Sequence, residues 1–275
     1  MTVKFFFDFG HGKKRTADGR GDPGAVNEKE GLIESDLVEI IGGHAAEFLK
    51  NNYTGFEIGY TRKDDSFVSL SNRCKKANAW GADYFISFHI NAGGGTGYES
   101  FVYTNASSKS VALQNMINAK AIAAAKKHGL GVHGDASKRK NLAVLRGTTM
   151  PAVLTETCFI DSSRDIKLLK NSAFLKDMGY AYGQALAEFT GLPKKAVSKP
   201  APSVPASTGI KLLVVEYDGK DGLNYRSKPD YTAKPVGVAR KGDAFTIVDE
   251  EGDFYKVKSG YYFTKNPKYV SVKTK

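Results

Sequence analysis

Two histidines and two carboxylates in this chain have the types and positions needed for metal-dependent hydrolysis. His11 closes the segment FFFDFGHG, His89 closes DYFISFH, and Glu156 follows the apolar run AVLT. Glu34 lies in EGLIESDLVEI, just ahead of a helical pattern. Two imidazoles and one carboxylate are a common three-ligand set for zinc, which leaves a coordination position for water and substrate. A second carboxylate beside the ion can move the protons of amide hydrolysis, and we assign that role to Glu156.

The residues alone leave the carboxylate ligand open. Glu28 and Glu30 precede Glu34 in the same segment, and spacing excludes neither of them. Glu34 also has a purely structural explanation, because an acidic side chain near a helix N-terminus interacts favourably with the helix dipole. The pattern therefore predicts a metal site made of His11, His89 and one of these three acids, of which we favour Glu34.

An alternation of strand-like and helix-like segments must position these side chains. Apolar runs predict strands, and apolar residues spaced three and four apart predict helices. Strands are expected at 3–9, 56–60, 83–89, 97–104, 142–146 and 152–156, and helices from about 36, through 70–77, at about 108–128 and near 171–190. This order predicts an α/β fold with a mainly parallel sheet flanked by helices. Ligands of such sheets gather at the carboxyl ends of the strands, where the four candidate residues would meet.

The remaining histidines and the two cysteines are expected to have structural roles. His44 lies within a helical pattern, whereas His128 and His133 flank a glycine-rich turn. Cys74 and Cys158 are too few and too far apart for a disulfide framework, which fits a reducing compartment. Cys158 follows the expected catalytic acid closely, but we interpret it as a small buried core residue.

The composition changes sharply after residue 191. The segment LPKKAVSKPAPSVPAST, residues 192–208, is rich in proline, alanine, serine and lysine and has no run that would form a core. Its prolines favour an extended conformation that would separate two bodies by up to ~50 Å, at ~3.1 Å per residue. We therefore predict a catalytic domain at 1–191, a linker at 192–208 and a second domain at 209–275.

The first domain resembles the zinc-dependent N-acetylmuramoyl-L-alanine amidases of the amidase-3 family. The motifs that carry the resemblance follow in order: DFGHG, GDPGA, ESDL, TRKDDSFVSLSNRCKKANAWGADYFISFHINA, GYESFVY and NLAVLRGTTMPAVLTETCFIDSSRD. The resemblance implies that His11, Glu34 and His89 bind zinc and that Glu156 is the catalytic acid. It also implies the bond that is cut, the amide between the lactyl group of N-acetylmuramic acid and the first L-alanine of the stem peptide in peptidoglycan.

The chain departs from the family's pattern at two places. Phe9 replaces the proline that is usual in the first motif, and KKRTADGR, residues 13–20, is inserted between GHG and GDPGA. The insert would leave the sheet edge close to the expected metal, so it is either a basic flap over the substrate or a solvated surface loop. Asp8 and Asn91 neighbour the expected ligands in the sequence, and the resemblance carries them over as residues that orient these ligands.

The second domain resembles a bacterial SH3-like module. Short β-favouring runs are separated by turn residues at 241–242, 252–253 and 259–260, as expected for a small β-barrel. Five aromatic residues are candidates for its core or for a peptide-binding groove: Tyr225, Phe254, Tyr255, Tyr261 and Tyr262. Such modules commonly bind the cell wall in lytic enzymes, and the resemblance implies the same function here.

Charge and hydropathy limit the partners. Lys and Arg outnumber Asp and Glu by 40 to 29, so the chain is attracted to polyanions such as the teichoic acids of a Gram-positive wall. The sequence contains no P-loop, zinc-finger spacing or RNP-type motif, so we expect no nucleic-acid binding. No apolar stretch approaches the length of a membrane span, and the apolar start is cut short by Asp8, so we expect neither membrane insertion nor a signal peptide.

These features predict a monomeric peptidoglycan hydrolase that is made in the cytoplasm and acts on the wall after the membrane is permeabilised. A phage endolysin is the interpretation we favour, and a cellular autolysin is the main alternative. Two other classes of protein fit parts of the sequence. A zinc peptidase would cut within the stem peptide or its cross-link, and a non-catalytic wall-binding protein would keep the fold without turnover.

Overall fold

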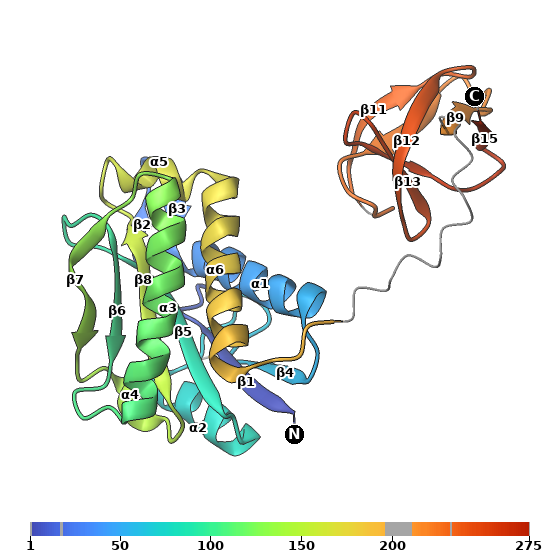
Figure 1. Cartoon of the computed structure of the whole chain (residues 1–275). Coiled ribbons are helices and arrows are strands. Elements are labelled where there is room, and N and C mark those ends of the chain that lie inside the picture. The colour runs from blue at the N-terminus through green and yellow to red at the C-terminus, as the bar shows by residue number, and fades with distance from the viewer. Residues whose placement is uncertain (1, 17–18, 196–210, 232, 275) are drawn as a thin grey trace. The chain divides into compact units, whose positions relative to one another are not determined.

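The computed structural model divides the chain into two compact units, Met1–Val197 and Ser198–Lys275. The structure describes residues 2–16, 19–195, 211–231 and 233–274 (Figure 1). Most of the predicted linker, from residue 196 onward, lies outside the described residues. Within the described ranges, no helix combines the length and the apolar character that crossing a membrane requires.

A six-stranded sheet forms the centre of the first unit, in the order β4-β1-β5-β8-β6-β7. The strands are β1 (Val3–Phe9), β4 (Phe56–Tyr60), β5 (Tyr84–Asn91), β6 (Tyr98–Val102), β7 (Val132–Arg139) and β8 (Ala152–Phe159). Every neighbouring pair is parallel except β6 with β8. β2 (Val26–Asn27) and β3 (Leu32–Ile33) form a separate small hairpin. The predicted α/β fold with a mainly parallel sheet is confirmed.

Helices cover both faces of this sheet. They are α1 (Glu34–Asn52), α2 (Leu70–Trp80), α3 (Ser108–Lys127), α4 (Ala143–Gly147), α5 (Asp165–Leu169) and α6 (Ser172–Thr190). α1, α3 and α6 pack side by side on one face (Figure 1), whereas α2 and α4 contact each other on the opposite face. Because side chains alternate along a strand, Phe5 and Phe7 of β1 join the first core and Phe6 joins the second. The apolar start of the chain is thus a strand buried on both faces.

The structure corrects two expectations for the segment between α3 and β8. Residues 142–146, predicted as a strand, form the helix α4, in which the neighbouring Val144 and Leu145 are both buried. Both side chains face α2 from this short helix, and Leu145 N donates to the Leu142 carbonyl, so the segment bonds to itself rather than to a strand. The strand β7 was not predicted. It is polar and mostly exposed, and an edge strand needs backbone pairing rather than an apolar pattern.

The first unit continues a little beyond its last helix. α6 is followed by Gly191, which adopts the left-handed conformation typical of a helix end, with φ of 63°. Leu192 is buried in the main core, and the Pro193 carbonyl accepts a hydrogen bond from Thr54 N at 2.9 Å. Residues 192 and 193 therefore contact the first unit. The domain boundaries at residues 191 and 208 stay predictions.

The second unit is a small antiparallel β-structure. Its strands are β9 (Lys211–Val215), β10 (Leu223–Arg226), β11 (Pro235–Ala239), β12 (Ala244–Glu251), β13 (Phe254–Val257), β14 (Tyr262–Thr264) and β15 (Val270–Thr274). They pair in the order β11-β10-β14-β13-β12-β9-β15. The aromatic candidates divide between buried residues, Phe254 and Tyr262, residues packed on the core, Tyr225 and Tyr255, and the exposed Tyr261. The predicted small all-β fold is confirmed.

Candidate active site

The four predicted site residues lie at one edge of the central sheet. His11 follows the carboxyl end of β1, His89 lies near the end of β5, and Glu156 of β8 is opposite His89 in the strand register. Glu34 is the first residue of α1. Because β1, β5 and β8 are parallel neighbours, their carboxyl ends meet at this edge. The topology thus brings side chains from four separate segments to one place.

Three of these residues form a compact cluster of possible metal ligands. One ligand atom each from His11, Glu34 and His89 lies within 4.8 Å of the others. Glu34 Oε1 is 3.2 Å from His11 Nε2 and 2.9 Å from His89 Nδ1. The two imidazole rings meet edge to face, with their centroids 5.0 Å apart. The Glu34 side chain is only 5% exposed, but those of His11 and His89 are 23% and 17% exposed, so the cluster is accessible from the histidine side.

Main-chain amides hold Glu34 in the cluster. Ile90 N donates to Glu34 Oε1 at 3.0 Å, and Ala25 N donates to Glu34 Oε2 at 2.8 Å. Burial alone would raise the pKa of this carboxyl, but hydrogen bonds and charge interactions with His11 and His89 lower it strongly. Glu34 is therefore an ionised carboxylate in a fixed position.

The backbone around His11 takes conformations that few residues adopt. His11 has a φ of 62°, in the left-handed region, and the neighbouring Gly10 and Gly24 leave the space that the cluster needs. A Cβ atom at Gly10 would approach the His89 ring to 2.5 Å, and one at Gly24 would approach Glu34 Oε2 to 2.5 Å. The glycines of the GHG and GDPGA motifs thus allow the three side chains to converge.

Asp22 orients His11, and the sequence reasoning missed it. Its Oδ2 lies 2.8 Å from His11 Nδ1, and its Oδ1 accepts a hydrogen bond from Gly24 N at 3.0 Å. An acceptor beside Nδ1 favours the proton on that nitrogen and leaves Nε2, which faces Glu34, free to bind a metal. Gly12 and Asp22 exchange two backbone hydrogen bonds, which keep the carboxylate beside the ring. The GDPGA motif carries Asp22 and was the available signal.

Asp8 contributes to the site mainly through Arg73. Its buried carboxylate pairs with Arg73 Nη1 at 2.8 Å and accepts hydrogen bonds from Ser87 and Thr61. Burial would raise the pKa of Asp8, but these partners outweigh burial and keep that pKa below its usual value. Arg73 Nη2 donates to the His11 carbonyl at 2.6 Å. Asp8 therefore supports the backbone of His11 and does not orient an imidazole.

Glu156 is a partly buried carboxyl group beside the cluster. It is in register with His89 on one side and with Glu99 of β6 on the other. Within the described part of the chain, its Oε2 has no hydrogen-bond partner. Burial raises the pKa of Glu156 well above its usual value, and the negative charges of Glu34 and Glu99 raise it further. A carboxyl group of this kind is suited to take up and release a proton.

Asn91 is linked to the site through Glu99. Its Nδ2 donates to Glu99 Oε1 at 2.5 Å, and its Oδ1 accepts a hydrogen bond from Ala92 N. Glu99 is paired with Lys138 as well. Asn91 therefore supports the carboxylate next to Glu156, and the expectation that it orients a metal ligand is corrected.

A cavity of about 690 Å³ opens beside the cluster, on the face of the sheet that carries α2 and α4. His11, Asp22, His89 and Glu156 line it, together with residues 67–71 and 142–144. The segment wrongly predicted as a strand, residues 142–146, thus supplies part of a wall. The cavity gives a substrate access to both the cluster and Glu156.

The other candidate residues lie elsewhere. Glu28 is exposed, Glu30 pairs with Lys170, His44 with Glu47 and His128 with Asp177, and His133 packs on Phe159. Among the histidines, cysteines and acids that the structure describes, only His11, Glu34 and His89 form a group with metal-ligand spacing. Cys74 and Cys158 are buried free thiols.

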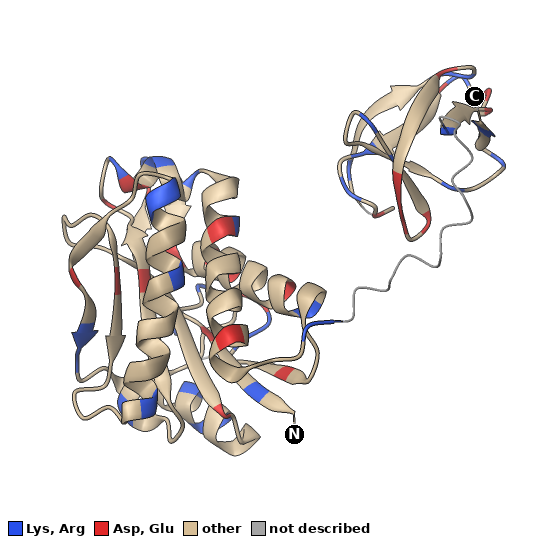
Figure 2. Ribbon diagram, in the orientation of Figure 1, with Lys and Arg blue, Asp and Glu red and all other residues tan. Residues whose placement is uncertain are grey.

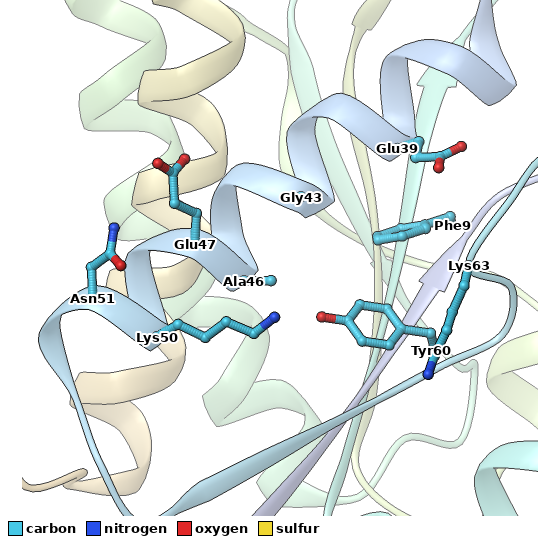
Figure 3. Close-up of a pocket in the computed structure, with 9 residues that line it drawn as sticks. All are labelled: Phe9, Glu39, Gly43, Ala46, Glu47, Lys50, Asn51, Tyr60 and Lys63. Atoms are coloured by element: carbon cyan, nitrogen blue, oxygen red, sulfur yellow. The ribbon is translucent and has the colours of Figure 1, made fainter. Parts of the chain in front are cut away.

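A second hollow, of about 550 Å³, lies between α1 and β4 (Figure 3). Phe9, the residue that replaces the usual proline, lines it together with Tyr60, and the two ring centroids are 5.6 Å apart. A Cβ atom at Gly42 of α1 would approach the Phe9 ring to 2.3 Å, so this glycine leaves room for the ring. The departure at Phe9 therefore fills space on the α1 face and leaves the metal-ligand cluster intact.

Comparisons with known proteins agree with this geometry. The family model described as N-acetylmuramoyl-L-alanine amidase matches residues 6–188, and the model described as bacterial SH3 domain matches residues 221–268. The chain is 37% identical to the endolysin of Bacillus phage SPP1, with both proteins covered over their whole length. It is also 37% identical to the sporulation-specific N-acetylmuramoyl-L-alanine amidase of Bacillus subtilis (strain 168), over 71% of each protein.

Solved structures show the same fold in the first unit. The catalytic domain of the amidase CwlV from Bacillus (Paenibacillus) polymyxa var. colistinus matches with a TM-score of 0.61 and 27% identity, covering 70% of this chain and 100% of that domain. An N-acetylmuramoyl-L-alanine amidase from Clostridium difficile 630 matches with a TM-score of 0.62 and 25% identity, covering 69% and 97%. The family model, the relatives and the site geometry agree, and the chain belongs to the N-acetylmuramoyl-L-alanine amidase family, with a bacterial SH3 domain after the amidase domain.

Proposed function

We propose that this amidase cuts peptidoglycan with a zinc ion held by His11, Glu34 and His89 and with Glu156 as the group that moves protons. The bond is the amide between N-acetylmuramic acid and the L-alanine of the stem peptide, the bond for which the family is named. The observation that carries the assignment is the convergence of three metal-ligand atoms beside a partly buried carboxyl group, with His11, His89 and Glu156 all lining one cavity.

The donor set fits zinc. Two imidazole nitrogens and one carboxylate oxygen are donors that zinc accepts, and three protein ligands leave a position for the reactants. Asp22 holds the ring of His11 with Nε2 toward the cluster, and main-chain amides hold Glu34. A zinc ion bound there would act as a Lewis acid on the substrate carbonyl and would lower the pKa of water.

Glu156 is proposed to carry the protons of the reaction. Hydrolysis adds water across the C–N bond, so the attacking water loses a proton and the leaving nitrogen gains one. The Glu156 carboxylate accepts the first proton, and the resulting carboxylic acid donates it to the amine of L-alanine. The raised pKa of Glu156 favours the protonated form, so a positive charge in the cluster is needed to keep the group ionised before the attack.

The similarity over the whole chain favours a phage endolysin over a cellular autolysin. The Bacillus phage SPP1 endolysin matches both the amidase domain and the SH3 region, whereas the sporulation-specific amidase matches 71% of the chain. We propose that residues 1–191 cut the wall, that 192–208 link the domains, and that 209–275 hold a monomeric enzyme on the wall once the membrane is permeabilised. Figure 2 shows Lys and Arg spread over many elements, which fits general attraction of a chain of net charge +11 to an anionic wall and its teichoic acids.

The test is a digest of purified Gram-positive cell walls by the metal-stripped protein, with and without added zinc. We expect zinc-dependent release of L-alanine amino termini with muramic acid left intact, read by mass spectrometry and amino-terminal labelling. A peptidase acting within the stem peptide would expose a different terminal residue. If the folded, zinc-loaded protein binds these walls and a panel of other peptidoglycan types but cuts none of them, the proposal is wrong and the chain is a binding protein.

A further inference from the structure

A basic hollow adjoins the active-site cavity. It has a volume of about 480 Å³, and its charged lining residues in the described part of the chain are Arg20, Lys75 and Lys76, with no acid among them. Residues 67–69 line both this hollow and the active-site cavity, so the two share a wall. A substrate segment that leaves the active-site cavity over residues 67–69 would therefore enter the hollow.

One side of the hollow is the exposed face of α2. Asn72, Lys75 and Lys76 lie three and four residues apart and so project from the same face of the helix. The opposite face of α2 carries the buried Arg73, which supports His11. The same helix thus holds the active site with one face and the basic hollow with the other.

The other side of the hollow includes Thr16 and Arg20, which belong to the described parts of the insert, residues 13–16 and 19–20; these parts pair as a hairpin. Gly12 and Asp22 exchange backbone hydrogen bonds, and Thr16 N donates to the Arg20 carbonyl at 2.7 Å. Lys14 N donates to the Asp65 carbonyl at 2.9 Å, which joins the hairpin to the segment that leads into residues 67–69. The segment that departs from the family's pattern therefore borders the hollow.

Two cations of the hollow, Lys75 and Lys76, pair with no acid among the described residues. Among the described residues, Lys75 has no ion-pair or hydrogen-bond partner, and Lys76 donates to the uncharged Thr61 carbonyl at 2.8 Å. Two lysines on one helix face with no acid between them raise the local potential and favour an anionic ligand.

We propose that the basic hollow binds a carboxylate of the stem peptide while the scissile amide lies at the metal-ligand cluster; this inference rests on the proposed function. On the glycan side of the amide, the lactyl carboxyl group is itself the acyl half of the bond, and N-acetylated sugars are uncharged. On the amine side, the peptide continues with free carboxylates. An anionic group next to the scissile bond therefore belongs to the peptide, which would cross residues 67–69 toward α2. The hollow makes the enzyme selective for stem peptides whose carboxylates are free.

The test compares two soluble muropeptides as substrates of the zinc-loaded full chain, one with free stem-peptide carboxylates and one in which they are converted to carboxamides. We expect the unchanged chain to have the higher kcat/KM for the acidic substrate. Lys75→Glu should lower kcat/KM for that substrate about tenfold, mainly through KM, because the attraction of an exposed ion pair becomes a repulsion. The same variant should leave kcat/KM for the carboxamide substrate within about twofold.

Lys126→Glu is the matched control, since it makes the same charge change at an exposed residue of α3, on the opposite face of the sheet. It should behave like the unchanged chain on both substrates. Equal effects of Lys75→Glu and Lys126→Glu, or equal rates of the unchanged chain on both substrates, would overturn the inference and leave the amidase proposal standing. If Lys75→Glu lowers binding to isolated teichoic acid but keeps the preference between substrates, the hollow serves wall phosphates and the inference is also wrong. A zinc-loaded chain that cuts neither substrate would overturn the proposed function and this inference with it.

Discussion

The active-site cavity and the hollow of Figure 3 have similar volumes, about 690 and 550 Å³, but their walls differ in kind. The cavity collects polar groups from strand ends, and hydrogen bonds from other segments hold most of them. The charged residues of the hollow belong to its surface: Glu39 pairs with Arg62 and Glu47 pairs with His44, while Lys50 and Lys63 have no partner among the described residues. The volume of a cavity is therefore a poor indicator of a catalytic site. The number of polar groups that hydrogen bonds hold in place is a better one.

The largest expected effects come from the cluster and its neighbouring acid. His89→Ala should lose both zinc and activity, because it removes one of three ligands. Glu156→Gln should keep zinc and lower kcat by about 10²–10⁴-fold, because the amide cannot take up and release a proton. Metal analysis of the purified variants, together with rates on cell walls, separates the two outcomes. A Glu156→Gln protein that cuts at nearly the unchanged rate would remove Glu156 from the proposed mechanism.

The next effect concerns the buried ion pair that supports the cavity. Asp8→Asn leaves Arg73, whose side chain is 3% exposed, without its anion, so we expect a loss of about 3–5 kcal/mol in the free energy of unfolding. Denaturant unfolding at pH 7 measures this loss. Asp177→Asn is the control, because it weakens a partly exposed pair with His128, in which Asp177 is 44% exposed, and should cost less than about 1 kcal/mol.

The difference in the free energy of unfolding between the unchanged chain and Asp8→Asn should depend on pH. The pKa of Asp8 is lowered in the folded protein, so the ionised carboxylate contributes its full stability above the unfolded pKa of 3.8. That contribution is lost as the pH falls through the lower folded pKa. The gap between the unchanged chain and Asp8→Asn should therefore be constant from pH 7 to about pH 5 and shrink below about pH 4. A gap that grows on acidification would show that Asp8 is not ionised in the folded protein.

Much of the fold and most of the cluster could be predicted from local patterns. The run of Phe5 to Phe7 is followed by a glycine-flanked histidine, so both the buried strand and the turn after it could be predicted. Glu34 was placed just ahead of the helix, but it is the first residue of α1, and the helix start was hard to fix from sequence because no side chain caps it. The edge strand β7 could not be found, because its polar residues carry no apolar pattern.

The residues that support the cluster could not be predicted in the same way. Arg73 reaches the His11 carbonyl from α2, and Asn91 bonds to Glu99 instead of to a ligand. Asp22 reaches His11 only because a hairpin brings the two ends of the insert together. Such contacts depend on how distant segments pack, and neither periodicity nor motif spacing specifies them.

Asp22 gives a sharper test of the difference between the two cavities. It orients the metal ligand His11 but is not itself a metal ligand, so its substitution measures the effect of orientation alone. Asp22→Asn keeps the size of the side chain but weakens the acceptor beside His11 Nδ1, so we expect zinc affinity to fall about tenfold. The Asp22 side chain is 46% exposed. We therefore expect the lower end of the about 10–100-fold loss of metal affinity that is typical when a residue that orients a metal ligand is replaced. Competition with a chelator measures the affinity. Asp36→Asn, which breaks a surface pair with Lys13, is the control, and equal affinities in the two variants would remove Asp22 from the site.

The smallest effect is expected in the hollow of Figure 3, where Lys50 matches Lys75 in type, in charge and in having no partner in the described part of the chain. Lys50→Glu should change kcat/KM on the acidic muropeptide by less than about twofold, because the hollow shares no lining residue with the active-site cavity. Lys50→Glu, folded and loaded with zinc, could instead lose as much activity as Lys75→Glu. A position beside the active-site cavity would then not explain the loss of kcat/KM in Lys75→Glu. Net charge would then explain both variants, and the contrast between the two regions would fail.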